Sequence, residues 1–177
     1  VAVLPDESRV YVAHKQTGKV SVLDPSSGSV VSEVAVGRRP EALAVSPDGR
    51  RVYVSNFHSD DVTVIDATSH TVIGTVSVGD RPREMAVTSD GTKIYVANRT
   101  PMSPNGTVSV IDVGVDAVTA TVTVGERPMD AAVTPGGRKV YVANTGSNTV
   151  SVIDAASDSV AKTIRVQGSP NDVTLSP

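Results

Sequence analysis

The feature that most constrains the fold is a short phrase that occurs four times. Residues 9–14 read RVYVAH, and the later copies read RVYVSN (51–56), KIYVAN (93–98) and KVYVAN (139–144). The four tyrosines in these phrases are spaced by 42, 42 and 46 residues. A fixed period near 42 residues predicts one supersecondary unit per repeat, with each unit stacked on the next.

Each repeat contains four strand candidates joined by turn residues. In the second copy these candidates are EALAVS (41–46), RVYVSN (51–56), DVTVID (61–66) and VIGTVSV (72–78). Hairpin turns are predicted at PDES (5–8), SPDG (46–49), TSDG (88–91) and TPGG (134–137). Four short antiparallel strands in about 42 residues predict the blade of an all-β propeller, with each Tyr buried between sheets.

The chain is predicted to be one domain, 1–177, with four blades. The repeats span about 1–42, 43–84, 85–130 and 131–172, and residues 173–177 match the start of a fifth. Three arrangements stay open: an arc of a larger propeller, which we prefer, then an eight-bladed ring of two chains, then a lone four-bladed ring. The first two predict self-association through open blade edges.

The amino-acid composition limits the kinds of molecule that the chain is expected to bind. The formal net charge is −3 and aromatic residues make up 3% of the chain, so neither nucleic acid nor an anionic lipid surface is an expected partner. No apolar run approaches the roughly 20 residues that cross a bilayer, so no membrane span is expected. The sequence shows no signal peptide and no initial Met, and we expect a mature or excised chain.

The repeated phrases resemble a known family. YVSN and YVAN, followed by VTVID or VSVID and then by GxRP and SPDG, are similar to the YVTN-repeat β-propellers, and the likeness covers nearly the whole chain. The resemblance implies a bacterial or archaeal surface-layer or secreted protein, located outside the cell or on its surface. It also implies kinship with propellers of amine dehydrogenases, haem-containing nitrite reductases and lactonases.

Several repeated polar residues are interpreted as structural. Asn56, Asn98 and Asn144 end the second strand and are expected to act as strand-end turn devices. The residues Asp24, Asp66, Asp112 and Asp154 end the third strand and predict Asx turns, with calcium binding as the sharper alternative. His58 lies beside Asp60 and Asp61, where a metal is conceivable but solvation is favoured. No catalytic residue, metal or cofactor is predicted.

The turns between blades carry the candidate binding residues. They read GRRP (37–40), GDRP (79–82), GERP (125–128) and QGSP (167–170). A residue before Pro is expected to be extended, so Arg39, Arg81 and Arg127 should point alike around the channel mouth. Arg38, Arg83 and Arg99 are expected to add to this face. Alternatively, the arginines pair with the acids that follow each Pro, which are Glu41, Glu84, Asp130 and Asp172.

Two function classes remain. The first is a non-catalytic scaffold that presents loops to a protein or to an anionic ligand of the cell envelope, and the near-identity of the blades leans against an enzyme. Its partner specificity is expected in the loop at 99–106 and at Phe57 and His58. The alternative is the propeller portion of an oxidoreductase or a lactonase-like enzyme whose active residues lie outside this chain.

Overall fold

The chain folds into four β-sheets of four strands each. A computed structural model describes residues 1–101 and 103–175, and within them there is no helix and hence none that could span a membrane. All four sheets are antiparallel, with their strands in sequence order. The predicted all-β propeller with four four-stranded blades is confirmed.

The strand bounds follow the repeat. The first blade contains β1 (Ala2–Val3), β2 (Val10–His14), β3 (Lys19–Asp24) and β4 (Ser29–Ala35), and the second contains β5 (Pro40–Val45), β6 (Arg51–Asn56), β7 (Asp61–Asp66) and β8 (Thr71–Ser77). The third contains β9 (Pro82–Val87), β10 (Lys93–Asn98), β11 (Thr107–Asp112) and β12 (Ala117–Thr123), and the fourth contains β13 (Pro128–Val133), β14 (Lys139–Asn144), β15 (Thr149–Asp154) and β16 (Ser159–Arg165).

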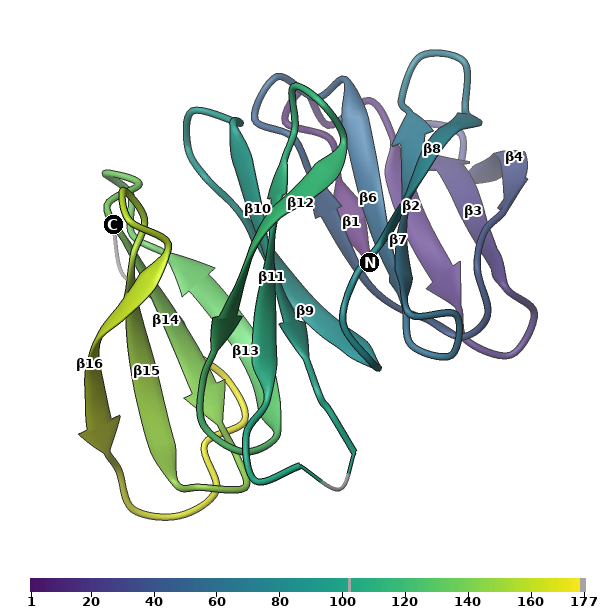
Figure 1. Ribbon diagram of the computed structural model, residues 1–177. Helices are drawn as coiled ribbons and strands as arrows, with labels where there is room; N and C mark the ends of the chain where they lie inside the picture. The colour runs from purple at the N-terminus through teal and green to yellow at the C-terminus, as the bar shows by residue number, and fades with distance from the viewer. Residues whose placement is uncertain (102, 176–177) are drawn as a thin grey trace.

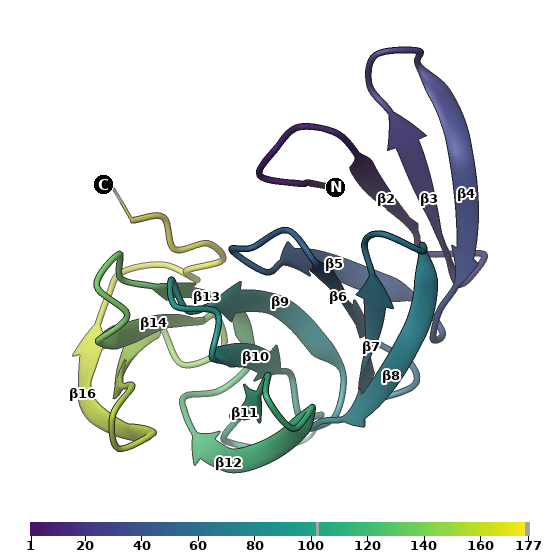
Figure 2. The ribbon, with the colours of Figure 1, turned by 90° about the horizontal axis from the view of Figure 1, so that it is seen from above.

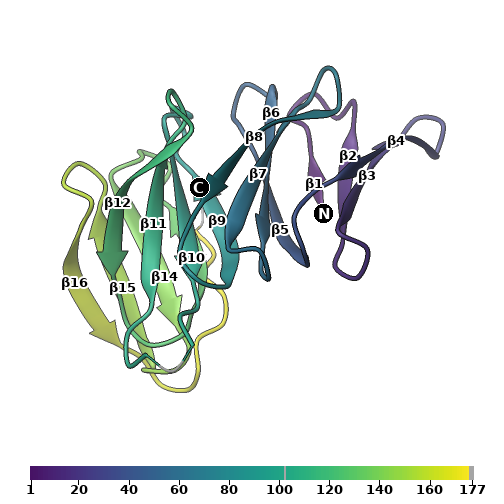
Figure 3. The same cartoon turned by 45° about the vertical axis from the view of Figure 1, so that its right-hand side comes forward.

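The blades form an open arc. Seen from above, β5, β9 and β13 lie on the inner side and β4, β8, β12 and β16 on the outer side (Figure 2). The first and fourth blades stand at opposite ends and do not meet (Figures 1 and 3). The arrangement is a partial propeller, and the lone four-bladed ring is not what the chain forms here.

The turns use left-handed backbone where the sequence predicts it. In the four first-to-second-strand turns, the N–H of Glu7, Gly49, Gly91 or Gly137 donates to the carbonyl three residues earlier over 2.7–2.9 Å. All four residues have a positive φ, between +59° and +70°, so Glu7 adopts the conformation that glycine usually supplies. The predicted hairpin turns are confirmed.

The predicted Asx turns are confirmed as well. Asp66 Oδ1 accepts the backbone N–H groups of Ser69 over 2.7 Å and Thr68 over 3.0 Å. These hydrogen bonds, the Ser69 N–H first, hold the pKa of Asp66 below its ordinary value. Equivalent bonds form at Asp24, Asp112 and Asp154. Each of these carboxylates therefore already serves its own turn.

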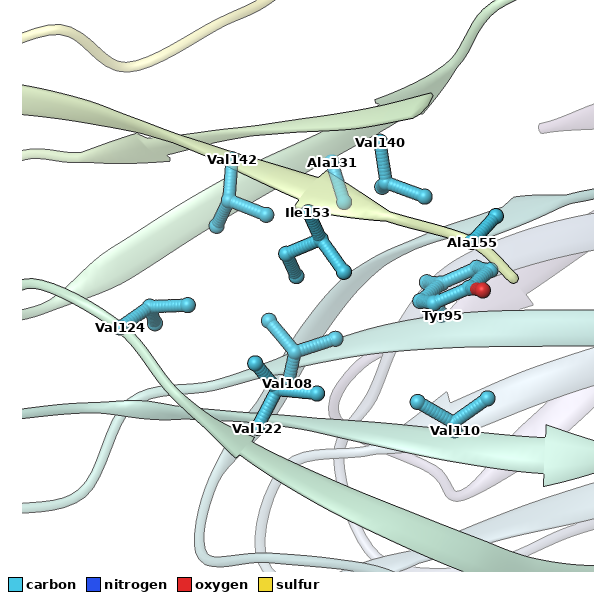
Figure 4. Close-up of a cluster of buried hydrophobic side chains, with 10 residues drawn as sticks. All are labelled: Tyr95, Val108, Val110, Val122, Val124, Ala131, Val140, Val142, Ile153 and Ala155. Atoms are coloured by element: carbon cyan, nitrogen blue, oxygen red, sulfur yellow. The ribbon is translucent and has the colours of Figure 1, made fainter. Parts of the chain in front are cut away.

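The core lies between blades rather than within them. Three apolar clusters fill the three junctions, and Figure 4 shows the one between the third and fourth blades. Tyr11, Tyr53 and Tyr95 are fully buried in these junctions, as predicted. The same prediction is wrong for Tyr141, which is only partly buried, because no described blade covers the far side of the fourth sheet.

The repeated asparagines end the second strand, as predicted, and they bond across the following loop to side chains of the third strand rather than to their own backbone. The Nδ2 groups of Asn56, Asn98 and Asn144 donate to hydroxyls on the third strand, namely Thr63 Oγ1 at 2.8 Å and Ser109 and Ser151 Oγ at 2.9 Å. A glycine of the preceding blade packs on each of them, and a Cβ on Gly79 would come within 2.8 Å of Asn98 Nδ2. Gly and Asn thus form one contact between blades.

We expect Tyr95→Ala to destabilise the protein by about 3–5 kcal/mol, because it empties a filled junction. Tyr141→Ala should cost roughly half of that or less, since this ring is already partly exposed. Denaturant unfolding of both variants measures the difference. Equal losses would show that the different burial of the two rings does not determine their contributions to stability.

Gly79→Ala is expected to cost more than about 2 kcal/mol, because the new methyl group overlaps Asn98. Gly136→Ala is the matched control, since a Cβ there meets no atom within 4 Å. The control should change the free energy of unfolding by no more than about 0.5 kcal/mol. If both variants unfold at the same denaturant concentration, the Gly–Asn contact is not a constraint on blade packing.

Candidate functional site

The loops from the second to the third strand and the turns from blade to blade lie at the same end of the arc, because strands alternate in direction. Arg39, Arg81 and Arg127 occupy this end, but their predicted extended backbone is wrong, since φ is +55°, +52° and +55°. Their carbonyls accept the N–H groups of Phe57, Arg99 and Thr145 over 2.9–3.2 Å. The left-handed conformation orients each carbonyl toward this hydrogen bond. The hydrogen bond outweighs the usual preference of a residue before Pro for extended backbone.

Phe57 gathers three of the candidate arginines. Its ring is 5% exposed, and the guanidinium carbons of Arg39 and Arg83 lie 4.4 and 4.6 Å from its centroid. Arg81 lies farther away, at 5.7 Å. The His58 ring lies 5.1 Å from Phe57, centroid to centroid, and its Nε2 is 3.4 Å from Arg39 Nη1. The Phe57 ring therefore makes cation–π contacts with arginines of this chain and is not free to stack on a ligand.

Glu41 neutralises part of the positive charge of the arginines around Phe57. Its Oε1 lies 2.8 Å from Arg83 Nη1 and 2.9 Å from Lys15 Nζ, and its Oε2 lies 3.6 Å from Arg39 Nε. Arg39 and Arg83 therefore pair with a neighbouring acid, as the alternative interpretation of the sequence predicts. Arg38 is exposed, and its Nη2 donates to the carbonyl of His58 over 2.8 Å.

The remaining arginines share a pocket. Its volume is about 640 Å³, and it is lined by Arg81, Arg99, Thr100, Pro101, Ser103, Pro104, Glu126 and Arg127. Within the described chain, no carboxylate lies within 4 Å of the guanidinium group of Arg81, Arg99 or Arg127. Burial lowers the pKa of Arg99, and the positive charges of Arg127, Arg83 and Arg81 lower it further. The pocket therefore holds positive charge that its own acids do not balance.

The inserted loop builds one wall of this pocket. Residues 98–106 hold the four extra residues of the third repeat, and Thr100, Pro101, Ser103 and Pro104 come from there. Thr100 and Ser103 were not singled out in the sequence, although the insertion itself marked the loop. Arg81 and Pro101 also line a neighbouring hollow of about 330 Å³ beside Phe57 and His58. The binding role of the whole arginine set stays a prediction.

The carboxylates near His58 are engaged elsewhere. Asp60 Oδ1 accepts the backbone N–H of Arg81 over 2.8 Å, and Asp61 Oδ1 accepts the Nδ2 group of Asn56 over 2.6 Å. Across residues 1–101 and 103–175, no three His, Asp or Glu side chains gather closely enough to hold a metal ion. His58 is exposed and turned to Phe57 and Arg39.

Asp130 and Asp172 were named as alternative partners of the arginines, and within residues 1–101 and 103–175 neither carboxylate lies within 4 Å of an arginine side-chain nitrogen. Asp130 Oδ1 accepts the N–H of Ala131 over 2.8 Å, and Oδ2 accepts the N–H of Val173 over 2.7 Å. Burial raises the pKa of Asp130 to about 6, and the neighbouring Asp172 carboxyl adds to the rise. Residues 172–175 approach this strand without forming a strand themselves.

We expect Asp172→Asn to lower the pKa of Asp130 from about 6 toward its ordinary value of 3.8. Because the folded state holds this proton more tightly than the unfolded chain, the Asp130 contribution to stability falls as pH rises from about 4 to about 6. The variant should show less of this fall than the wild type in unfolding experiments across that range. Unchanged pH dependence, or an unchanged carboxyl NMR titration, would contradict the pairing.

Two models of known protein families match this chain. The model of the YNCE-like β-propeller family matches residues 1–92, and that of the lactonase seven-bladed β-propeller family matches residues 75–165. A search of curated proteins finds no match.

Two of the matching solved structures illustrate the shared fold. The hydrazine synthase of Kuenenia stuttgartiensis superposes with a TM-score of 0.85 and 31% identity over 92% of this chain and 47% of that one. The dihydro-haem d1 dehydrogenase NirN in complex with DHE gives a TM-score of 0.79 and 22% identity over 96% of this chain and 38% of that one. This chain thus spans about half or less of these proteins. By the extent of the family matches, it belongs to the YNCE-like β-propeller family, and its second half also matches the seven-bladed lactonase propellers.

Proposed function

We propose that this chain is a binding module that holds an anionic partner on the loop end of the propeller and supplies no chemistry from its own residues. The observation that carries the proposal is the pocket of Arg81, Arg99 and Arg127, whose guanidinium groups have no carboxylate within 4 Å in the described chain. Burial first, and then the neighbouring positive charges, lower the pKa of Arg99, and an incoming anion offsets the repulsion among these charges.

The pocket chemistry suits phosphate, sulfate or carboxylate groups. The guanidinium group donates in a planar fork that matches these oxyanions, and the hydroxyls of Thr100 and Ser103 add neutral donors. Glu126 on the lining lowers the net charge and disfavours anions that approach on its side. Phe57 supports this arrangement indirectly, because it packs under Arg81 at 5.7 Å.

The location of the protein is part of the same proposal. The repeats YVSN and YVAN resemble those of YVTN propellers, which supports a surface-layer or secreted protein that binds an anionic component of the cell envelope or another protein. Fractionation of the source cells with an antibody against the chain tests the location. Recovery from the soluble cell interior alone would contradict it.

We expect the chain to bind inorganic tripolyphosphate, measured by isothermal titration calorimetry, with an affinity that falls as salt rises. Arg81→Gln with Arg127→Gln should weaken this binding by at least about tenfold, because charge-assisted hydrogen bonds are lost. The fold should stay intact, since both side chains are exposed.

A charge-matched control separates a built site from general attraction. Arg50→Gln with Arg138→Gln removes the same charge from first-to-second-strand turns, which lie at the opposite end of the arc. The control should bind tripolyphosphate within about twofold of the wild type. Equal weakening in the two double variants, or no binding by the wild type, would overturn the anion-binding proposal.

A second candidate is the propeller portion of a larger enzyme. It is favoured by the lactonase family match and by the 31% identity to hydrazine synthase. In this case the reactive groups come from outside the chain, and the pocket would position an acidic substrate or cofactor. A survey of bound metals and cofactors in the protein purified from its source tests this candidate, and a preparation without either would count against it.

A further inference from the structure

Two junctions between blades share an ion pair at the end of the arc opposite the arginine pocket. At the second junction, between the second and third blades, Arg51 Nη1 lies 3.0 Å from Asp116 Oδ1. At the third junction, Lys93 Nζ lies 2.7 Å from Asp158 Oδ2. In both cases the cation begins the second strand of one blade, and the carboxylate lies in the third-to-fourth-strand turn of the next. A cation of one blade is thus neutralised by a carboxylate of the next blade.

The first junction, between the first and second blades, has the cation without the carboxylate. Arg9 directly precedes β2 at the position of Arg51, and His70 holds the turn position of Asp116. His70 has the left-handed backbone of this position, with φ +55° where Asp116 has +48°. Its Nδ1 lies 3.1 Å from Tyr11 Oη of the first blade. The first junction therefore keeps the geometry of the contact but lacks its negative charge.

Arg9 has hydrogen-bonding capacity that the described chain does not use. Its Nη1 donates to the carbonyl of Ser8, and its Nε is buried without a hydrogen-bond partner in residues 1–101 and 103–175. The one carboxylate that reaches it there is Asp24, whose Oδ2 lies 4.0 Å from Nη1 and whose Oδ1 accepts the N–H of Ser26 over 2.8 Å. A buried donor without an acceptor is costly, so this geometry favours a ligand with acceptor oxygens.

A pocket of about 290 Å³ lies beside Arg9. Its lining includes Arg9, Thr68 and His70, with Asp6 and the exposed Arg50. Asp6 Oδ1 accepts two hydrogen bonds of its own turn, over 3.0 and 2.7 Å, so this carboxylate is already engaged. The arginine pocket has more than twice this volume, and the smaller pocket suits a single oxyanion group.

The groups around His70 favour its neutral form. Burial first, and then the positive charge of Arg9, lower the pKa of His70, and the negative charge of Asp66 raises it in part. When Tyr11 Oη donates to Nδ1, the neutral ring carries its proton on Nε2. This N–H and the hydroxyl of Thr68 are then further donors for an anion in the pocket.

We propose that the first junction binds an oxyanion, the carboxylate or phosphate group of a small molecule, where the other two junctions hold an aspartate. The anion accepts from the guanidinium group of Arg9 in the first blade and from His70 and Thr68 in the second, and so links the two blades. The site is independent of the proposed function, because it uses other residues and lies at the other end of the arc.

Titration of His70 by proton NMR tests the site directly. Inorganic phosphate, added at constant ionic strength, should raise the pKa of His70, because a bound anion favours the imidazolium form. The ring of His14, which lies at the other end of the arc, should not respond. Acetate is the second probe, since a response to acetate assigns the site to carboxylates and a response to phosphate alone assigns it to phosphate groups. No response of His70 to either anion would overturn the proposal.

Two variants that remove the same charge from this pocket separate a built site from general attraction. Arg9→Gln should raise the half-saturating phosphate concentration at least about tenfold, because it removes the unpaired donors. Arg50→Gln should leave this concentration within about twofold of the wild type, since Arg50 is exposed and its charge is screened. Circular dichroism should confirm the fold of both. Equal weakening in the two variants would contradict a site built on Arg9.

A carboxylate returned to the first junction should replace the ligand. In a protein with Arg81→Gln and Arg127→Gln, which removes the response of the arginine pocket, phosphate should still raise the thermal unfolding midpoint. His70→Asp should abolish this gain, because Asp pairs with the cation at this turn position in two other junctions. His70→Asn is the uncharged control and should keep most of the gain. Equal gains in the Asp and Asn proteins would overturn the proposal, whatever the arginine pocket binds.

Discussion

Every blade of this chain depends on the apolar face of its neighbour. A single four-stranded sheet cannot cover both of its faces, and the three core clusters accordingly lie in the junctions, each with residues from two blades. The repeated tyrosine fills the junction and the Gly–Asn contact sets how closely the sheets approach. Side chains at both ends of the arc are placed by this packing, since the turns start from strands whose positions the junctions determine.

Much of this fold could be predicted because the same pattern of strands and turns occurs in four copies. Strand positions and hairpin turns follow from local residue preferences, and four copies in register remove the ambiguity of any one copy. The exceptions concern contacts with the next blade. Tyr141 has the sequence context of Tyr95 but not its burial, and Asn98 is explained by Gly79 of the blade before it rather than by its own turn.

The candidate site was harder to predict than the fold because equivalent arginines have different neighbours. Arg39 and Arg81 occupy the same turn position, but Glu41 lies near Arg39 and the inserted loop lies near Arg81. Phe57 occurs in one repeat only, and it fixes several guanidinium groups around one ring. The repeat therefore predicts the backbone position of each arginine. Residues that differ between the repeats determine whether the charge of that arginine is neutralised.

Left-handed residues link the two ends of the arc. A left-handed backbone costs a non-glycine residue about 1–2 kcal/mol, and Gly18, Gly28 and Gly49 show that glycine is available to this chain for such positions. Yet Arg39, Arg81 and Arg127 occupy them at one end, and Asp116 and Asp158 at the other. At the Asp positions the strain is offset by a contact with the preceding blade, at 3.0 Å to Arg51 and 2.7 Å to Lys93. At the three Arg positions the carbonyl of the left-handed residue accepts a backbone N–H of the next loop over 2.9–3.2 Å, and this hydrogen bond offsets the strain there.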